Sequence, residues 1–355
     1  MATPFVSVLI DTYNHERFIE EALSSVLGQD YPAASREIIV VDDGSTDRTP
    51  EILRKFEAHA RILLKTNGGQ ASAFNHGIAQ CKGEIVAFLD GDDWWAPDKL
   101  TRVAQTLMAN PSLGIVGNGL FVVNRDGSKQ NEILREGFRF QANTIEGARL
   151  FRRRCSFLGT SRMTIPAHVL RQIGPLPEDI KIQADEYLYT LAAVIGGAQI
   201  LPEQLTYYRL HDANLFQMTT HDLQKLRLKQ ESLQGVATHL DQRLEELGIS
   251  SGVRRAVLAY TQACADQLRL VIRGGSSLET FKTEWKLYRV IHPEAPYSHR
   301  TFKLLTLFGA LLLPPRVFYS MQRKVAHSEF YLRMRKRLLP IPKLEHIQGD
   351  KAPPP

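Results

Sequence analysis

The stretch EIVAFLDGDDWWAPDKL (84–100) runs from an apolar segment into three carboxylates and then into the start of a helix. Its first part, EIVAFLD, is largely apolar, which is typical of a strand buried on both faces of a sheet. The carboxylates of Asp90, Asp92 and Asp93 repel one another at this spacing, so they need a positive partner. A divalent cation is the natural one, and Mg²⁺ or Mn²⁺ would take one or two carboxylates together with phosphate oxygens of a substrate. The alternative, that strand-end aspartates only cap helices, is the one we favour for Asp47.

The same order of elements recurs on the N-terminal side of this stretch. Short apolar runs predict three more strands, and segments with apolar residues at helical spacing follow them. The predicted strands are FVSVLID (5–11), EIIVVDD (37–43) and RILLK (61–65), and the predicted helices are 16–29, 49–60 and 69–80. This alternation predicts an α/β fold with a doubly wound, mostly parallel sheet. Ligands of such sheets bind beyond the carboxyl ends of the strands, where Asp11, Asp42 and Asp43 join the acids of the first stretch.

Beyond residue 110 the pattern becomes mixed and then helical. Further strands are predicted at 113–127, at SFLGTSRMTI (156–165) and at QLTYYRLH (204–211), with helices at 144–154 and from Ala184. From about residue 219, leucines at seven-residue spacing indicate the packing faces of a helical bundle rather than a functional coiled coil. We therefore expect an α/β domain over 1–215 and a C-terminal all-helical appendage. The appendage would consist of a bundle extension over 216–296 and, over 297–355, apolar and basic helices with a disordered tail.

The last part combines apolar and basic sequence. FKLLTLFGALLL (302–313) is apolar all round but too short to span a bilayer. The following segment, RVFYSMQRKVAHSEFYLRMRKRLLPIPK (316–343), holds eight Lys or Arg residues against one Glu, interleaved with apolar side chains. This pattern is typical of a helix that lies on an anionic membrane surface. The alternative is a core helix followed by a solvated basic face.

Composition and missing motifs exclude several classes of protein. The chain has 355 residues, a formal net charge of +6 and three scattered cysteines, Cys81, Cys155 and Cys264, which suit a reducing compartment. The N-terminus lacks the pattern of a signal peptide. No phosphate-binding P-loop, no G-x-G-x-x-G after the first strand and no G-x-S-x-G nucleophile elbow is present. A nucleic-acid partner is not expected, because the basic residues cluster beside apolar sequence at the C-terminal end.

Five quoted segments carry a resemblance to a known family. VSVLIDTYNHERFIEEALSSVLGQ, EIIVVDDGSTDRTPEIL, NGGQASAFNHGIAQCKGEIVAFLDGDDWW, ADEYLYTLA and YYRLHDAN, in this order, resemble glycosyltransferase family 2 over about residues 5–215. The resemblance implies a GT-A fold. It also implies inverting, metal-dependent transfer of a sugar from a nucleotide-diphosphate donor to a hydroxyl of a glycan or lipid-linked acceptor. Cell-surface polysaccharide synthesis is the expected setting, with UDP as the first guess for the nucleotide.

The resemblance also assigns donor-binding roles to positions that follow the first four predicted strands. These positions are Thr12, Tyr13, Asp42, Asp43, Asn67, Gly68 and Asp90. Thr12 and Tyr13 would line the base and ribose, and Asp42 would accept a hydrogen bond from the base with support from Asp43. Asn67 and Gly68 would lie along the donor pocket, and Asp90 would approach the ribose.

The remaining site residues concern the metal and the catalytic base. Asp90 and Asp92 match the outer positions of the family's D-x-D signature, and Asp92 would coordinate a metal that bridges the diphosphate. Asp93 would be a further ligand or would support the others. His211 would approach the metal and the diphosphate, although it also suits a buried structural histidine. Asp185 would be the catalytic base, the alternatives being a helix cap or an ion pair with an arginine.

One position departs from the family pattern. Many members carry an arginine where Phe74 stands, so the cation that would neutralise the donor is missing there. Lys65, Arg162 or Arg209 could replace it. Trp94 and Trp95, next to the acids, suit either stacking on an acceptor sugar or ordinary packing.

Two other classes of function stay open at this point. A sugar-nucleotide nucleotidyltransferase would need a glycine-rich basic loop after the first strand, which IDTYNHER does not offer. A non-catalytic nucleotide-binding or membrane-docking module would predict loss of the metal or base carboxylates, which are present. The leading hypothesis is a cytoplasmic glycosyltransferase held peripherally on the inner face of the cell membrane, near acceptors such as a polyprenyl-linked glycan.

Overall fold

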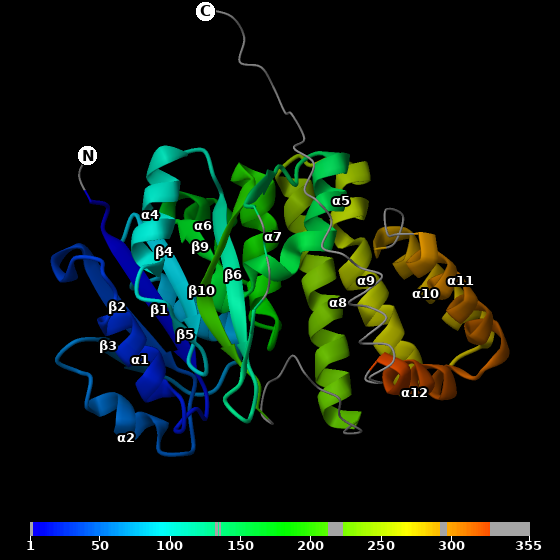
Figure 1. Ribbon diagram of the computed structural model, residues 1–355, viewed down its shortest axis with the longest axis horizontal. Helices are drawn as coiled ribbons and strands as arrows, with labels where there is room; N and C mark the ends of the chain where they lie inside the picture. Colours follow the sequence, from blue (N-terminus) through cyan, green and yellow to red (C-terminus); the bar gives the residue numbers. More distant parts are fainter. Residues whose placement is uncertain (1–2, 132–133, 135, 212–222, 292–296, 327–355) are drawn as a thin grey trace, which may run out of the picture.

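The computed structural model describes residues 3–131, 134, 136–211, 223–291 and 297–326 as a mixed α/β protein with C-terminal helices (Figure 1). The strands are β1 (Val6–Thr12), β2 (Arg36–Asp42), β3 (Arg61–Leu64), β4 (Ile85–Asp90), β5 (Trp94–Trp95), β6 (Ile115–Val123), β7 (Lys129–Asn131), β8 (Phe138–Phe140), β9 (Thr164–Pro166) and β10 (Ala198–Arg209). The helices of the α/β part are α1 (Ile19–Leu27), α2 (Thr49–Arg54), α3 (Gln70–Ile78), α4 (Lys99–Ala109), α5 (Ile145–Arg154), α6 (Ala167–Ile173) and α7 (Ala184–Gly196).

In this described part, ten strands form a single sheet with the order β3-β2-β1-β4-β9-β6-β10-β5, while β7 pairs with β6 and β8 pairs with β10. The strands β3, β2, β1 and β4 run parallel, and β10 runs parallel to β6. The short strands β5, β7, β8 and β9 are antiparallel to their neighbours. This arrangement confirms the predicted doubly wound, mostly parallel sheet.

The register of the parallel strands brings the acidic residues to one edge. Asp11 of β1 lies opposite Asp90 of β4, and Thr12 lies opposite Asp42 of β2. Because parallel strands finish at the same edge, side chains that are about 80 residues apart in the chain become neighbours. The sheet itself therefore assembles the acids predicted to bind a ligand.

Helices cover both faces of the sheet, as the continuous apolar runs of the strands require. One layer packs α1 and α4 against β1 and β4, through residues such as Ile10, Leu23 and Leu100. The opposite layer packs α3 and α7 against the same strands, through residues such as Phe88 and Leu188. Side chains that alternate along one strand thus enter two different cores.

One predicted strand is wrong. Most of SFLGTSRMTI (156–165) forms two 3-10 turns, η2 (Cys155–Leu158) and η3 (Thr160–Arg162), and only its last residues join the short strand β9. The carbonyl oxygen of Ser161 accepts hydrogen bonds from Trp95, Lys99 and Thr206 side chains instead of from a strand. These side-chain donors satisfy the backbone without a sheet, and they place η3 beneath the acidic edge.

The helical part follows the α/β part and packs against it. Its helices are α8 (Leu223–Glu246), α9 (Ser251–Arg273), α10 (Ser277–Ile291), α11 (Tyr297–Leu312) and α12 (Pro315–Ala326). Helix α8 lies against α7 and α9 against α5, whereas α10, α11 and α12 form the end of the molecule away from the sheet (Figure 1). Within the described residues, none of the helices has the length and apolarity that a membrane crossing needs.

Three expectations concern residues outside the described ranges. The boundary placed at 215–216 falls within 212–222, and most of the basic segment 316–343 falls within 327–355. The expected disordered tail also lies there.

Candidate active site

Three aspartates in the turn after β4 form a compact acidic cluster. Asp90, Asp92 and Asp93 each present a carboxylate oxygen, and these oxygens lie within 4.8 Å of one another. Asp11, at the end of the neighbouring strand β1, adds a fourth carboxylate, and its Oδ1 is buried without a hydrogen-bond partner among the described residues. Hard oxygen ligands at this density suit a divalent cation.

Two histidines stand on the Asp92 side of the cluster. His211, just after β10, lies with Nε2 2.8 Å from Asp92 Oδ2, and His15 Nε2 lies 3.8 Å from the same oxygen. Burial acts to raise the pKa of Asp92, but the two histidines outweigh it and lower that pKa. The predicted pairing of Asp92 with His211 is therefore present in the geometry. His15 was not predicted, and Nδ1 of its ring lies 3.2 Å from Thr12 Oγ1.

Asp93 turns inward and is held by its surroundings. Ser161 Oγ donates to Asp93 Oδ2 at 2.6 Å, and the backbone N–H of Arg209 donates to Asp93 Oδ1 at 2.9 Å. Burial, followed by the charge of Asp92, raises the pKa of Asp93 well above its usual value. The same hydroxyl of Ser161 accepts the N–H of Asp90 at 3.1 Å, so one serine connects two members of the cluster.

A buried lysine lies behind the acids. Lys99 is fully buried, and its Nζ donates to the Ser161 carbonyl oxygen at 2.7 Å and to Asn118 Oδ1 at 2.9 Å. The ammonium also lies 4.5 Å from the centre of the buried Trp95 ring. Burial lowers its pKa well below the usual lysine value. Lys99 thus fixes η3, and through Ser161 it fixes the cluster.

Asp185 is brought to this edge by the start of α7. The residue before the helix, Gln183, has a left-handed backbone with φ of 62°, which is uncommon for a non-glycine residue and is often found at functional sites. Asp185 Oδ2 accepts the N–H of Thr160 at 3.3 Å, and its Oδ1 accepts the N–H of Glu186 at 2.9 Å. Since Thr160 and Ser161 are adjacent in η3, this single turn contacts both Asp185 and Asp93.

Burial gives Asp185 the pKa of a base that works near neutrality. Burial, followed by the nearby charge of Glu186, raises the pKa of Asp185 to about 6. Burial raises the pKa of Asp90 as well, and the charges of Asp11, Asp92, Asp93 and Asp185 add to it in that order. The neighbouring acid, Glu186, pairs with an arginine, since Arg152 Nη1 lies 3.2 Å from Glu186 Oε1.

The buried Glu186 also connects the α/β part to the helical part. Thr261, in the middle of α9, donates its hydroxyl to Glu186 Oε1, and Arg152 Nη1 donates to Thr261 Oγ1 at 3.0 Å. All three side chains are buried. The helical part therefore contacts the residue next to Asp185 directly.

The predicted nucleotide side of the site follows β2 and β3. Asp42 Oδ1 accepts the N–H of Ser45 at 2.9 Å and leaves its second oxygen at the strand edge. The carboxylate of Asp43 accepts hydrogen bonds from within the chain. Lys65 Nζ donates to it at 2.5 Å, and the N–H groups of Gly68 and Gly69 donate at 2.9 and 2.7 Å. Asp43 thus shapes the 65–69 loop.

The other predicted donor residues border this loop and β1. Thr12 is buried, whereas Tyr13 and Asn67 are exposed at the edge. A Cβ on Gly68 would lie 2.7 Å from Ser72 Oγ, so the loop passes close to α3. The geometry places these residues beside Asp42, on the same side of the acidic cluster as β2.

The departure at Phe74 has a structural explanation. Phe74 is fully buried and packs edge-on against Phe88, with ring centres 5.4 Å apart, so this position does not line the site. Of the three cations considered in its place, Lys65 binds Asp43 and Arg162 Nε donates to the Asn118 carbonyl oxygen. Arg209 contacts the acidic cluster, through hydrogen bonds to Asp92 and Asp93.

Arg209 links the cluster to an aromatic stack. Its Nε donates to the Asp92 carbonyl oxygen at 3.0 Å, and its guanidinium lies 4.4 Å from the centre of the Trp94 ring. Trp94 is stacked on Tyr207 with ring centres 4.9 Å apart and an angle of 4° between the planes. The Trp94 ring therefore packs against both Arg209 and Tyr207 within the protein.

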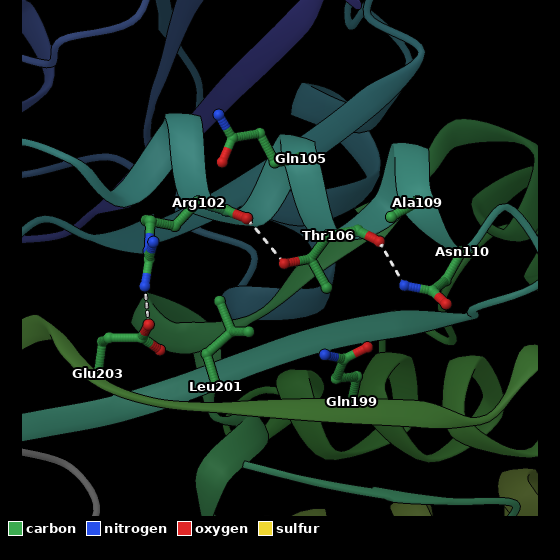
Figure 2. A pocket seen from close by; sticks show the side chains of 8 residues that line it. All are labelled: Arg102, Gln105, Thr106, Ala109, Asn110, Gln199, Leu201 and Glu203. Carbon is green, nitrogen blue, oxygen red and sulfur yellow. Dashed lines mark hydrogen bonds and ion pairs between the residues drawn. The ribbon is translucent and has the colours of Figure 1, made fainter. Parts of the chain in front are cut away.

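A groove of about 340 Å³ lies elsewhere on the surface, between α4 and β10 (Figure 2). Arg102 and Glu203 form an ion pair at one end of it, and Gln105, Asn110 and Gln199 also line it. None of the predicted site residues lines this groove. The acidic edge is therefore the better candidate for catalysis.

Comparisons with known proteins concern the family and the fold. Residues 7–168 match the model of the family described as glycosyl transferase family 2. An uncharacterized glycosyltransferase from Nostoc sp. is 31% identical over 214 residues, which is 59% of this chain and 66% of the relative. The chain spans just under two thirds of the length of the first two curated relatives that it matches, 66% and 63%.

Two solved structures share the fold. S. aureus TarS 1–349 in complex with UDP-GlcNAc superposes with a TM-score of 0.52 at 18% identity, over 85% of this chain and 90% of that one. The mannosyltransferase PcManGT from Pyrobaculum calidifontis, in complex with GDP-Man and Mn²⁺, superposes with a TM-score of 0.51 at 20% identity, over 94% and 84%. At these identities the structures show the GT-A fold alone, as predicted. Over residues 7–168 the chain is therefore similar to glycosyltransferase family 2, and its fold is the GT-A fold.

Proposed function

We propose that the protein is an inverting glycosyltransferase that moves a sugar from a nucleotide-diphosphate donor to a hydroxyl of a glycan or lipid-linked acceptor. The observation that carries the proposal is η3, which contacts Asp185 through Thr160 and the acidic cluster through Ser161. A base and an acidic cluster joined by one rigid turn can serve the two ends of a single displacement.

The nucleotide would bind along the ends of β1 and β2. Thr12 and Tyr13 would line the base and ribose, Asp42 would accept a hydrogen bond from the base, and Asn67 and Gly68 would border the pocket. UDP is the first candidate because TarS was solved with UDP-GlcNAc, and GDP is the second because PcManGT was solved with GDP-Man. Asp43 supports this side by holding the 65–69 loop.

The residues present fit a divalent cation, either Mg²⁺ or Mn²⁺. Asp92 would be the principal ligand, with Asp90 and His211 beside it and Asp93 supporting them from behind. The buried Asp11 Oδ1 has no hydrogen-bond partner among the described residues, which leaves it available as a further oxygen ligand at this edge. A bound cation supplies the positive charge that stabilises the leaving diphosphate, and PcManGT was solved with Mn²⁺.

Asp185 would act on the acceptor. Its carboxylate would take the proton from the attacking hydroxyl, on the side of the sugar opposite the diphosphate. A single displacement of this kind inverts the anomeric configuration and requires no nucleophile from the protein. The pKa of about 6 keeps Asp185 deprotonated at neutral pH, as this role demands.

We also propose that the protein works in the cytoplasm, at the inner face of the cell membrane. A polyprenyl-linked glycan would be presented there, and transfer to it would contribute to cell-surface polysaccharide synthesis. The basic and apolar C-terminal sequence supports this location.

The test is a screen of UDP- and GDP-sugars with Mg²⁺ or Mn²⁺ and extracted lipid-linked glycans, using the intact chain and Asp185→Asn. One donor should release its nucleotide, and the variant should lose about 10²- to 10⁴-fold in rate with unchanged donor affinity. Asp179→Asn is the matched control, since Asp179 is exposed and pairs with His239. Absence of turnover with every donor and extract would favour a non-catalytic nucleotide-binding module. A fully active Asp185→Asn would remove the base from the mechanism.

A further inference from the structure

Exposed apolar side chains gather on the helices farthest from the sheet. Thirteen large apolar side chains are strongly exposed in the described residues, and nine of them belong to α10, α11 or α12. These nine are Leu278, Trp285, Leu304, Leu305, Phe308, Leu311, Leu312, Val317 and Met321. Single exposed apolar residues are ordinary, but a cluster of this kind marks an interaction surface.

Five of these side chains form one face of α11, which we call the α11 face: Leu304, Leu305, Phe308, Leu311 and Leu312. Their spacing follows the helical repeat, so they project from one side of the helix. The opposite side of α11 is anchored, because Leu307 and Ala310 are buried and Ala310 packs with Phe318 and Tyr319 of α12. The helix is therefore fixed with an apolar side turned outward, and Leu312 is 80% exposed.

The segment that carries the α11 face contains cations and no acids, whereas the neighbouring helix α10 contains Glu279 and Glu284. The sequence from Tyr297 to Ala326 contains no Asp or Glu, whereas it contains five Lys or Arg residues. Arg300 precedes the face and Arg316 follows it, and both are exposed. An apolar stripe beside cations and without acids matches the chemistry of an anionic bilayer, in which acyl chains lie beneath negative headgroups.

The same charges argue against a second copy of this chain as the occupant. A two-fold interface would place the α11 faces together and bring the cations of both copies into proximity. An anionic lipid surface instead gains from each of them. In Figure 1, α11 belongs to the end of the molecule opposite α1 and α2, away from the strands that carry the acidic edge.

We propose that α11 lies in the headgroup region of an anionic bilayer, with Leu305, Phe308 and Leu312 inserted toward the acyl chains. Arg300 would contact the lipid phosphates, and Arg316 would do so with the guanidinium nitrogens other than Nη2, which donates to the carbonyl oxygen of Ile272 at 2.9 Å. The membrane location in the proposed function rests on this surface, whereas the donor chemistry does not. Vesicle binding and nucleotide release therefore succeed or fail separately.

The experiment is flotation of the full-length protein with vesicles of phosphatidylcholine alone or with 30% phosphatidylglycerol. The intact chain should float with the anionic vesicles and stay behind with the neutral ones. The variant Leu305→Ser/Phe308→Ser/Leu312→Ser should lose about tenfold or more in partitioning, because three apolar side chains no longer leave water. Leu64→Ser/Leu223→Ser is the matched control, since these leucines are 57% and 52% exposed and lie outside α10, α11 and α12, and it should float like the intact chain.

Several outcomes would overturn the proposal. Failure of the intact chain to float with anionic vesicles, or equal flotation with neutral ones, would remove the lipid partner. Equal flotation of the triple variant, or equal loss in the control variant, would show that the α11 face is not the docking surface. Light scattering without lipid adds a further test: a dimer that the triple variant dissociates would identify a second copy as the occupant. Unchanged thermal midpoints of both variants confirm that folding is preserved.

Discussion

Asp185 is a titratable group whose environment determines the pH at which the proposed reaction can proceed. Burial raises its pKa to about 6, and the base must be deprotonated to accept a proton. The rate of transfer should therefore rise with pH and reach a plateau above the pKa. A bound divalent cation attracts the carboxylate form, so the midpoint should lie at or below about 6. A pH profile of kcat from pH 4.5 to 8 measures this, and a rate that falls across this range would contradict Asp185 as the base.

Ser161 should act as a positioning residue for the acidic cluster. Its hydroxyl holds Asp93 at 2.6 Å and accepts the N–H of Asp90, so Ser161→Ala should release both. Residues that orient metal ligands typically contribute tenfold to a hundredfold in affinity, and we expect about a tenfold weaker metal activation. A titration of activity with Mn²⁺ measures the effect.

A matched control for Ser161→Ala exists on the surface. Ser128 donates to Asp126 at the same distance, 2.6 Å, but both residues are exposed. Ser128→Ala should leave metal activation unchanged. Equal behaviour of the two variants would mean that Ser161 contributes only to packing.

The sequence predicted the site unevenly at this scale. Asp90, Asp92 and Asp93 could be predicted because they are adjacent in the chain and end a strand. Ser161 and His15 could not, because their importance depends on which turn lies under the cluster and which loop lies over it. His15 follows Thr12 by three residues, and that closeness to a strand end was the available signal.

At the scale of elements, the parallel strands were predictable from their continuous apolar runs, which leave few alternatives. The segment 156–165 was not, because its apolar residues, Phe157, Leu158, Met163 and Ile165, fit a short strand as well as two turns. Lys99 and Trp95, about 60 residues earlier, supply the hydrogen bonds that favour the turns. Contacts of that range are invisible to local patterns.

Helix α9 should influence catalysis through its contact with α7. Thr261→Val removes the hydroxyl that donates a hydrogen bond to Glu186. Because the buried carboxylate then lacks one donor, the variant should lose about 1–3 kcal/mol of stability. Movement of Glu186 would also shift Asp185, so kcat should fall by about tenfold. Chemical denaturation and steady-state kinetics measure the two effects.

Thr280→Val separates the two effects of Thr261→Val. Thr280 is fully buried in α10, and among the described residues its hydroxyl donates only to the carbonyl oxygen of Ser276, one turn earlier. This variant should lose stability without losing kcat. Parallel losses of kcat in both variants would show that α9 has no specific role in the active site.

For the whole molecule, the acidic edge should make stability depend on pH and on divalent cations together. Burial, followed by the charge of Asp92, raises the pKa of Asp11 from 3.8 to about 8. The folded state therefore holds a proton that the unfolded state releases, so this contribution to stability falls as pH rises from about 4 to about 8. A cation that binds only the folded state restores it.

The metal-free protein should consequently show a lower Tm at pH 8 than at pH 5.5, and Mn²⁺ should raise Tm more at pH 8. Differential scanning calorimetry with and without Mn²⁺ measures both changes. Asp92→Asn should reduce the Mn²⁺ effect, since it removes the expected principal ligand. A Tm shift that is independent of pH, or equal in the variant, would place cation binding elsewhere.

The three-residue turn η3 also has a consequence for how such an enzyme can diversify. Thr160 and Ser161 would set the spacing between the proposed base, Asp185, and the acidic cluster proposed to hold the cation. Loops that select the acceptor hydroxyl can then be exchanged without a change in this spacing. Changes of acceptor specificity can therefore accumulate in the surrounding loops, while η3 keeps the distance between Asp185 and the acidic cluster constant.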